Sequence, residues 1–205
     1  MRNRSENQIT LVLIRHGATK ANNEHRYLGK TDEELSKEGE TKLLEYKKMC
    51  FFPKVDFLFS SPMKRCIQTA EILYPESKLV EIEEWKEIDF GIFEGKNYLE
   101  LQRDKRYQEW IDSNGTLPFS EGESREVFVA RCDRGFQKMI EKLKPIKKEG
   151  HKTVGIIVHG GTIMALLSKY CEGEYFDYQV PNGKGFICTM NHFDAEPEIM
   201  ELKKI

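Results

Sequence analysis

Residues 9–17, Ile9-Thr10-Leu11-Val12-Leu13-Ile14-Arg15-His16-Gly17, carry the strongest structural signal in the chain. The run from Ile9 to Ile14 is almost entirely apolar and rich in β-branched residues, as is typical of a strand buried on both faces of a parallel sheet. Residues 153–158 have the same character and are followed by His159-Gly160-Gly161. Both segments therefore predict a buried strand that ends in a histidine and a glycine-containing turn.

The rest of the chain alternates between predicted strands and helices. The other expected strands are residues 55–60, 79–82, 185–190 and 198–202. Helices are expected to begin at the N-cap residues Ser36 and Ser124, close to Pro62, and at Thr162, with Pro145 ending the helix that follows Ser124. This order predicts an α/β fold: a three-layer sandwich with a mostly parallel central sheet and helices on both faces. Sheets of this kind bind ligands beyond the carboxyl ends of their strands.

Residues 85–123 differ from their neighbours because they are aromatic and polar, with mixed periodicity. Gly115 and Pro118 interrupt them, and the pattern predicts short helices and loops. We therefore predict a single domain over residues 1–205 with a small helical cap inserted at about residues 90–123. Four aromatic side chains of this region either line a pocket under the cap or form the core of the cap: Trp85, Tyr98, Trp110 and Phe119.

The composition is that of an ordinary globular protein, with 39% apolar and 32% charged residues among 205. A formal net charge of −2 gives no global basic field, so no nucleic-acid partner is expected. No run approaches the roughly 18 apolar residues of a membrane span, and residues 1–8 lack the apolar core of a signal peptide. Five cysteines without a CxxC pair favour a reduced, cytoplasmic chain. Both a monomer and a homodimer are compatible with these features.

Any anion site must come from a local group of basic side chains, and three strand ends supply them. Arg15 and His16 follow the first predicted strand, and His159 follows a later one. Arg65 lies just after the second strand, at the start of a helix, where a cation is unfavourable for the helix dipole. A guanidinium binds two phosphate oxygens at once, and the helix N-terminus near Gly160 favours anions. The residues leave two alternatives open: satisfied core histidines and a solvated surface arginine.

Other phosphate chemistries lack their sequence signatures here. A cysteine phosphatase needs an arginine six positions after its cysteine, and none of the five cysteines has one. The segment 91–97, GIFEGKN, is one residue too short between its glycines for a P-loop and lacks the Ser or Thr that binds magnesium. There is no DxD metal motif, and the five histidines show no close metal-ligand spacing. We therefore expect no metal and no cofactor.

Five blocks of sequence together resemble the histidine phosphatase superfamily, which includes the cofactor-dependent phosphoglycerate mutases. In the family's order they are Arg15-His16-Gly17-Ala18-Thr19, residues 27–39, Ser60-Ser61-Pro62 with Arg65, Glu87-Ile88-Asp89-Phe90-Gly91, and His159-Gly160-Gly161-Thr162. They extend from Leu11 to about Leu167, so nearly the whole chain is covered. The resemblance implies an α/β sandwich with a small helical cap over the site and a metal-independent phosphatase.

The resemblance also implies roles for the basic residues. His16 is expected to be the nucleophile that takes the phosphoryl group, since a neutral imidazole nitrogen can attack phosphorus. Arg15, Arg65 and His159 are expected to surround the phosphoryl oxygens and to stabilise their charge during transfer.

The remaining predicted site residues follow from the same match. Glu87 corresponds to the family's general acid, with Asp89 the second choice, because one carboxyl group can protonate the leaving group and later accept a proton from water. Asn22 stands where the family has a phosphate-binding asparagine. The amides near Gly29 and Gly160 are expected to complete the phosphate cradle.

The expected partner is a small phosphorylated substrate that these residues do not identify. Four segments look like those of α-ribazole-5'-phosphate phosphatases of cobalamin assembly: Gly29-Lys30-Thr31-Asp32, the block around Glu87, Gly122-Glu123-Ser124 and Asn182-Gly183-Lys184-Gly185. Three alternatives remain. One is a broad-specificity phosphomonoesterase, and another is a phosphoglycerate mutase, although the basic pair expected after the acid block is absent. The third is a catalytically silent relative that binds a phosphorylated ligand.

Overall fold

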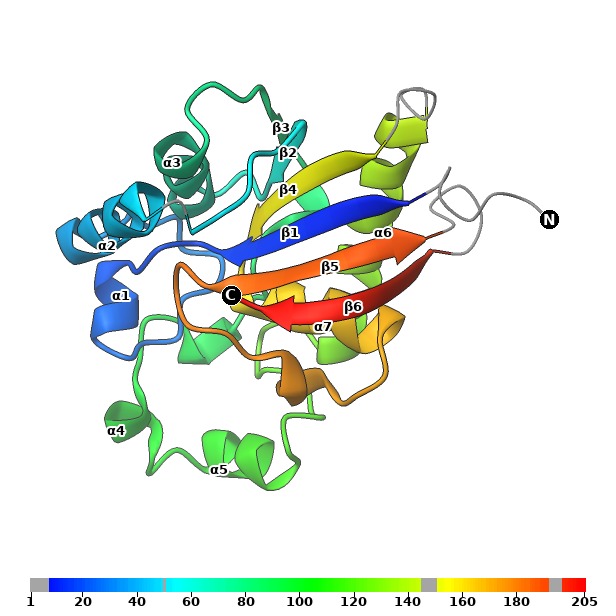
Figure 1. The fold of residues 1–205 in the computed structure, drawn as a ribbon. Helices are drawn as coiled ribbons and strands as arrows, with labels where there is room; N and C mark the ends of the chain where they lie inside the picture. Colours follow the sequence, from blue (N-terminus) through cyan, green and yellow to red (C-terminus); the bar gives the residue numbers. More distant parts are fainter. Residues whose placement is uncertain (1–7, 50, 145–150, 192–196) are drawn as a thin grey trace.

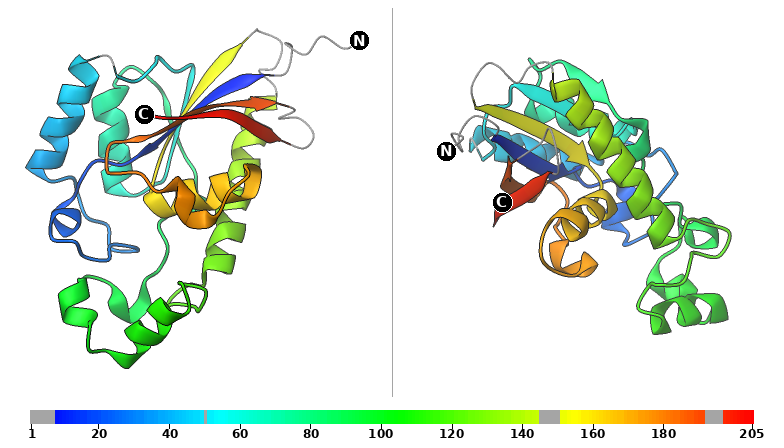
Figure 2. Two further views of the ribbon diagram at one scale, coloured as in Figure 1. Left: turned by 60° about the horizontal axis from the view of Figure 1, so that its bottom comes forward. Right: turned by 90° about the vertical axis from the view of Figure 1, so that its right-hand side faces the viewer.

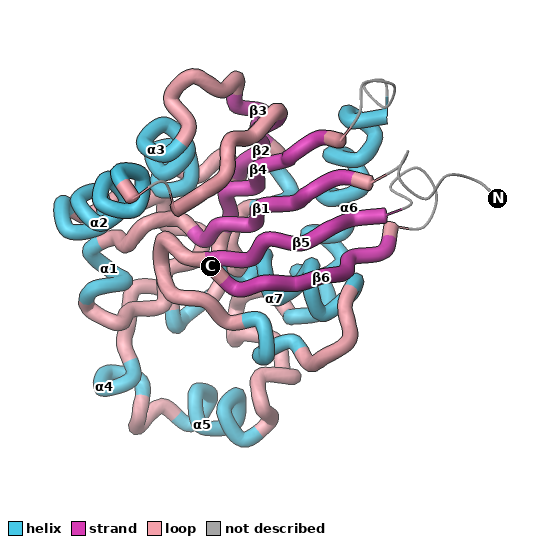
Figure 3. Tube along the Cα trace, viewed as in Figure 1, coloured by secondary structure: helices cyan, strands magenta, loops and turns pink. Residues whose placement is uncertain are grey.

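The computed structural model describes residues 8–49, 51–144, 151–191 and 197–205. Within them, six strands form one sheet in the order β3-β2-β4-β1-β5-β6 (Figure 1, Figure 3). They are β1 Ile9–Arg15, β2 Phe57–Ser60, β3 Leu79–Glu81, β4 Lys152–Val158, β5 Gly185–Asn191 and β6 Glu198–Lys204. Strands β1 to β4 pair in parallel, whereas β5 and β6 extend the sheet as antiparallel strands. The prediction of a mostly parallel sheet is confirmed.

Strand β1 lies inside the sheet and is covered on both faces. Its side chains alternate: Leu11 and Leu13 belong to one core cluster, and Val12 and Ile14 belong to the other. All four are fully buried. Because successive side chains of a strand point to opposite faces, an unbroken apolar run requires a core on each side. The sequence of β1 therefore accounts for a layer of helices on each face of the sheet.

Helices pack on both faces of the sheet (Figure 2). Helices α2 Lys37–Lys48 and α3 Lys64–Leu73 cover one face, and α6 Arg125–Leu143 and α7 Gly160–Tyr170 cover the other. The apolar face of α6 is buried along its length: Phe128, Cys132, Phe136, Met139, Ile140 and Leu143. None of the helices in the described part of the chain is long and apolar enough to cross a membrane.

The two predicted serine N-caps are present. Ser36 Oγ accepts from Gly39 N at 3.0 Å, and Ser124 Oγ accepts from Val127 N at 3.2 Å. These bonds determine where α2 and α6 begin. Pro145, which is predicted to end α6, lies outside the described residues.

Helix α7 begins earlier than the sequence predicts. The prediction of a Gly160-Gly161 turn before Thr162 is wrong, because both glycines belong to the first turn of the helix and His159 is its N-cap. The first amides of α7 therefore lie directly beside the end of β4. This places the electropositive end of a helix next to His159.

The segment between β3 and α6 forms short helices and loops, and its α4 and α5 lie apart from the sheet (Figure 1). Its helices are η1 Glu83–Trp85, η2 Gly91–Phe93, α4 Tyr98–Leu101 and α5 Lys105–Asp112. Aromatic ring contacts hold this segment together and join it to the loop after α1 Lys20–Asn23: Tyr27, Phe90, Phe93, Tyr107, Trp110 and Phe119. A short helix, η4 Tyr175–Tyr178, follows α7.

Candidate active site

The carboxyl ends of β1 and β4 place His16 and His159 side by side. The two strands pair with Arg15 opposite Val158, so the next residue of each strand is one of the histidines. The His16 amide donates to Val158 O at 2.9 Å, and the two imidazole rings meet edge to face with their centroids 5.2 Å apart. Parallel pairing in this register brings two histidines from distant parts of the sequence into one site.

His16 is held as a neutral imidazole. Its side chain is only 3% exposed, and its Nδ1 lies 2.7 Å from Gly17 O. Since a carbonyl oxygen only accepts hydrogen bonds, Nδ1 carries the proton and Nε2 keeps its lone pair. Burial, followed by the charges of Arg65 and Arg15, lowers the pKa of His16 well below its ordinary value. A nitrogen nucleophile is therefore present at neutral pH.

Arg15 and Arg65 bring two positive charges to the site, and backbone carbonyls position both. Arg65 is fully buried, and its Nη1 and Nη2 donate to Thr31 O and Gly29 O, both at 2.9 Å. Arg15 Nη1 donates to Val180 O at 2.9 Å. The Nε of each guanidinium is buried and has no hydrogen-bond partner among the described residues. Buried donors require an acceptor, and the alternative of a solvated arginine at position 65 is excluded.

Glu87 and Asp89 lie two residues apart but have opposite electrostatic environments. Burial raises the pKa of Glu87, and this effect exceeds the opposing effects of two backbone amides and two arginines. Burial acts in the same direction on Asp89, but hydrogen bonds from Gly91 N at 2.8 Å and Lys30 Nζ at 2.9 Å lower its pKa. Glu87 therefore retains a proton more readily, as a general acid must, whereas Asp89 is an ionised partner of an exposed lysine.

Glu87 lies directly against the start of α7. Its Oε1 accepts from Ile88 N at 3.0 Å. A Cβ atom built on Gly161 would lie 2.5 Å from the same oxygen. Only glycine at position 161 therefore allows the carboxyl group this close to the helix N-terminus.

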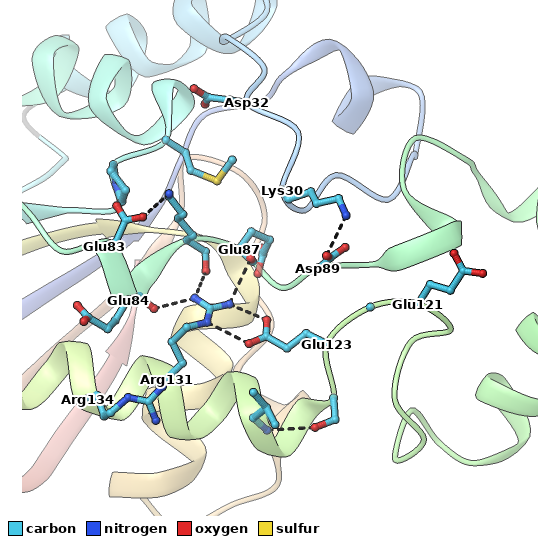
Figure 4. A pocket seen from close by; sticks show the side chains of 16 residues that line it. Lys30, Asp32, Glu83, Glu84, Glu87, Asp89, Glu121, Glu123, Arg131 and Arg134 are labelled. Atoms are coloured by element: carbon cyan, nitrogen blue, oxygen red, sulfur yellow. Dashed lines mark hydrogen bonds and ion pairs between the residues drawn. The ribbon is translucent and has the colours of Figure 1, made fainter.

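Arg131 of α6 supports the loop that carries Glu87 (Figure 4). Its Nη1 donates to the carbonyl oxygens of Glu84 and Lys86, both at 2.8 Å, and its Nη2 lies 3.4 Å from Glu87 O. Its Nε and Nη2 also pair with both carboxylate oxygens of Glu123, at 3.0 and 2.6 Å. A bidentate pair with additional backbone contacts is a geometrically specific support. The position of Glu87 therefore depends on α6 as well as on its own loop.

Asn22 and Gly160, two of the predicted cradle residues, lie beside these groups. Asn22 Oδ1 accepts from Asn182 Nδ2 at 3.0 Å, and the same Nδ2 lies 3.1 Å from His16 O. This contact orients the Asn22 amide so that its NH₂ group remains a donor. Gly160 packs against Arg15, since a Cβ built on it would lie 3.4 Å from Arg15 Nε.

The backbone of Gly29, a predicted cradle residue, is bonded within the protein. Its N–H donates to Glu94 Oε1 at 2.9 Å, so this amide is not available to a phosphate. Its carbonyl oxygen accepts from Arg65 Nη2, and a Cβ at this position would lie 2.1 Å from Ile88 O. Glycine is therefore required here for the close approach of two loops. Through its carbonyl oxygen, Gly29 helps to position the guanidinium of Arg65.

Three polar residues support the site although the sequence assigns them no role. Ser61 Oγ lies 2.8 Å from His159 Nε2, and Thr69 Oγ1 accepts from Gly17 N at 3.0 Å. Asn182 links Asn22 to the backbone of His16. A single hydroxyl or amide carries no sequence pattern that identifies its partner.

Among the four basic residues of the site, Arg15 lines a pocket of about 550 Å³. Glu87 and Gly160 also line it. We call four residues the floor: Arg15, His16, Arg65 and His159. We call four other residues, all of which line the pocket, the aromatic wall: Tyr27, Phe90, Trp110 and Phe119. The pocket therefore meets the floor at Arg15 and has the aromatic wall in its lining.

The four aromatic residues predicted for the cap divide into two pairs. Trp110 and Phe119 line the pocket. Trp85 does not, because it is fully buried beneath α6, where its Nε1 donates to Cys132 O at 3.1 Å. Tyr98 is 56% exposed and also lies outside the pocket. Sequence alone did not distinguish the wall from the core.

A second hollow of about 1000 Å³ reaches Glu87 from the side of Arg131 (Figure 4). It is bordered by charged residues of both signs but by neither Arg15 nor Gly160. In the described part of the chain, no group of three or more His, Cys, Asp or Glu side chains is arranged to hold a metal ion. Of these two hollows, the aromatic pocket is the one that Arg15, Glu87 and Gly160 line together.

Comparison with known proteins gives a consistent result. The family profile described as "Histidine phosphatase superfamily (branch 1)" matches residues 11–202. The uncharacterised phosphatase PhoE of Bacillus subtilis is 34% identical over 166 residues, which cover 80% of this chain and 78% of that protein. Phosphoserine phosphatase 1 of Hydrogenobacter thermophilus is 27% identical over 167 residues, which cover 80% and 75%.

Solved structures share the fold. Phosphoserine phosphatase of Entamoeba histolytica, in complex with 3-phosphoglyceric acid, is 26% identical with a TM-score of 0.72, covering 96% of this chain and 98% of that one. The α-ribazole phosphatase of Shigella flexneri has a TM-score of 0.74 over 94% of each chain, and at 20% identity it shows the fold alone. With the family profile spanning nearly the whole chain, this protein belongs to the histidine phosphatase superfamily and is a phosphatase of its first branch.

Proposed function

We propose that the protein hydrolyses a small phosphomonoester through a phosphohistidine intermediate on His16. This proposal rests on the arrangement of the four floor residues. It places a neutral imidazole next to two arginines whose buried Nε donors have no partner among the described residues. A phosphoryl group supplies both an electrophile for the imidazole and acceptors for these donors.

The first step transfers the phosphoryl group to the enzyme. His16 Nε2 attacks phosphorus while Nδ1–H remains bonded to Gly17 O. A P–N bond forms, the ester P–O bond breaks, and protonated Glu87 gives its proton to the leaving oxygen. Arg15 and Arg65 stabilise the charge on the equatorial oxygens.

The second step restores the enzyme. Water attacks the phosphohistidine, the carboxylate of Glu87 accepts its proton, and the P–N bond breaks to release inorganic phosphate and neutral His16. His159 contacts the same oxygens in this scheme, with Ser61 fixing its ring orientation. Asn22 adds an amide donor, and the first amides of α7 at Gly160 add a helix N-terminus that favours the anion.

Two substrate classes have specific support, and we infer that residues 90–123 act as the cap that distinguishes them. The aromatic wall favours a phosphomonoester with a ring in its leaving group, and α-ribazole 5'-phosphate is the example named by one fold relative. The second class is a phosphomonoester that also carries a carboxylate, as phosphoserine does. It is supported by the names of two relatives and by Arg125, which also lines the pocket.

The test of the proposed chemistry is a phosphoenzyme experiment in excess EDTA. We expect p-nitrophenyl phosphate to be hydrolysed, and a labelled substrate to leave an acid-labile phosphoenzyme on His16. His16→Ala should remove both the turnover and the label, because the stepwise route passes through this nitrogen.

The matched control is His151→Ala, since His151 is exposed at the opposite end of the sheet, just before β4. Label on another residue, or turnover that EDTA abolishes and magnesium restores, would contradict the histidine mechanism. Conversion of 3-phosphoglycerate into 2-phosphoglycerate, rather than release of phosphate, would identify a mutase instead.

A further inference from the structure

Arg125 is a second cation of the substrate pocket that the proposed chemistry does not use. It is the first residue of α6, it is half-buried, and it lines the same pocket as Arg15, Glu87 and Gly160. Its guanidinium carbon lies 5.4 Å from the ring centroid of Tyr175 and 5.9 Å from that of Phe176. Two aromatic faces therefore hold this group at the edge of the pocket.

Within the described residues, Arg125 has no carboxylate at ion-pair distance and no hydrogen-bond acceptor. Arg131, on the same helix, is the opposite case, because it binds Glu123 through two nitrogens and also binds backbone carbonyls. Glu126 and Glu174 border a neighbouring hollow that Arg125 also reaches, but neither pairs with it. Hydrogen bonds and ion pairs within the protein therefore explain why an arginine is present at position 131, but they do not explain the arginine at position 125.

Helix stability does not explain an arginine at this position either. The N-terminal turn of a helix carries a partial positive charge, which disfavours a cation there. The same partial charge adds to the guanidinium in attracting an anion into the pocket. Position 125 is therefore unfavourable for the helix and favourable for an anionic ligand.

We propose that Arg125 binds a carboxylate of the substrate, so that the enzyme prefers phosphomonoesters that carry a carboxylate beyond the ester oxygen. This inference rests on the proposed function and chooses the second of its two substrate classes. The pocket has two arginines and one carboxyl group among its lining side chains. Arg15 faces the phosphoryl group, Glu87 serves as the acid, and the charge of Arg125 remains for another part of the substrate.

One guanidinium matches one carboxylate in charge and in geometry. Its planar fork donates two parallel hydrogen bonds to the two carboxylate oxygens. A second phosphate group carries more charge than one arginine neutralises, and among the described residues that line this pocket the only cationic side chains are Arg125 and Arg15, which faces the phosphoryl group. The stacking on Tyr175 and Phe176 keeps the guanidinium in place before the substrate arrives, which lowers the entropic cost of binding.

The test compares substrates that differ only in the carboxylate. O-phosphoserine is paired with O-phosphoethanolamine, and 3-phosphoglycerate is paired with glycerol 3-phosphate. We expect the enzyme to prefer the carboxylate-bearing member of each pair in kcat/KM. Arg125→Gln should lower kcat/KM on those members by about ten- to hundred-fold, mainly through KM, since it removes a charge-assisted hydrogen bond. Arg125→Lys, which keeps the charge, should retain part of the preference.

The matched control is Arg134→Gln, which removes the same charge from an exposed position of the same helix outside this pocket. It should leave all four substrates unchanged. Equal activity on both members of each pair, or an Arg125→Gln effect of the same size on all four, would overturn the inference. A preference for α-ribazole 5'-phosphate or for a sugar bisphosphate over both carboxylates would also overturn it. Each of these outcomes leaves the phosphohistidine on His16 intact, so the two proposals fail separately.

Discussion

The floor and the aromatic wall are built by different kinds of contact. On the floor, His16 and Arg65 are almost completely buried and are oriented by hydrogen bonds to backbone carbonyls at 2.7 to 2.9 Å. In the wall, Trp110 stacks on Phe119 with ring centroids 4.8 Å apart, and Phe119 meets Phe90 edge to face at 4.9 Å. Directional bonds determine the position of each reacting atom, whereas ring packing defines a volume.

We therefore expect the floor to determine the rate of phosphoryl transfer and the wall to determine which substrates are preferred. A change on the floor leaves a buried donor or carbonyl without a partner, so it should affect every substrate. A change in the wall alters contact area only, so it should affect substrates in proportion to the rings they carry. Three substitutions test this distinction, with successively smaller expected effects.

Arg65→Ala should produce the largest loss, about 10²–10³-fold in kcat, on all phosphomonoesters alike. In the proposed mechanism, it removes one of the two arginines that stabilise charge on the transferring group. Steady-state kinetics on p-nitrophenyl phosphate and on an alkyl phosphate provide the measurement. An effect confined to KM would show that Arg65 contributes only to ground-state binding.

Because Arg65 also holds the carbonyls of Gly29 and Thr31, thermal unfolding of the variant must be compared with that of the wild type. Arg65→Lys serves as a second variant that keeps the charge but loses the two-pronged geometry. If the lysine variant is folded and fully active, the fixed guanidinium is not needed.

Glu87→Gln should produce an intermediate loss that depends on the leaving group. We expect a loss of about 10²-fold on an alkyl phosphate, at the lower end of what general acid catalysis contributes, and a much smaller loss on p-nitrophenyl phosphate, whose leaving group needs little protonation. In the wild type, kcat/KM on the alkyl phosphate should fall as pH rises through the raised pKa of Glu87, because only the protonated form donates. The kcat/KM of Glu87→Gln on the same substrate should not decrease over this pH range.

Asp89→Asn is the matched control, since Asp89 is two residues away and its pKa is lowered by Gly91 and Lys30. It should leave the ratio of the two substrates unchanged. If Asp89→Asn rather than Glu87→Gln changes that ratio, the assignment of the acid is reversed.

Trp110→Leu should produce the smallest effect, about three- to ten-fold in KM for substrates with a ring in the leaving group. kcat on small alkyl phosphates should stay within about two-fold, because no floor residue is changed. Tyr98→Leu removes an exposed aromatic ring outside the pocket and is the control. A uniform loss of kcat in Trp110→Leu would show that the wall also positions the floor.

The buried strands and the two terminal histidines were predictable because their signals are local and periodic. An apolar run such as Ile9–Ile14 can be stable only with a core on each face. Ser36 and Ser124 accept hydrogen bonds from amides three residues away, so the starts of these two helices could also be predicted from short segments of sequence. The family blocks added the assignments of Glu87 and Asn22, which composition did not distinguish from neighbouring polar residues.

Contacts between distant segments determined the rest. The burial of Arg65, the Gly29 amide bonded to Glu94 and the Asn182 bridge each join residues that no sequence period relates. Arg125 and Arg131 are both arginines of the same helix, and the sequence does not distinguish them. Only the structure shows that Arg131 is bonded to Glu123, whereas Arg125 stacks on Tyr175 at the pocket. Hydrophobic periodicity reports which face of an element is buried, but a hydrogen bond requires two particular atoms at about 3 Å, and the packing of the whole chain sets that distance.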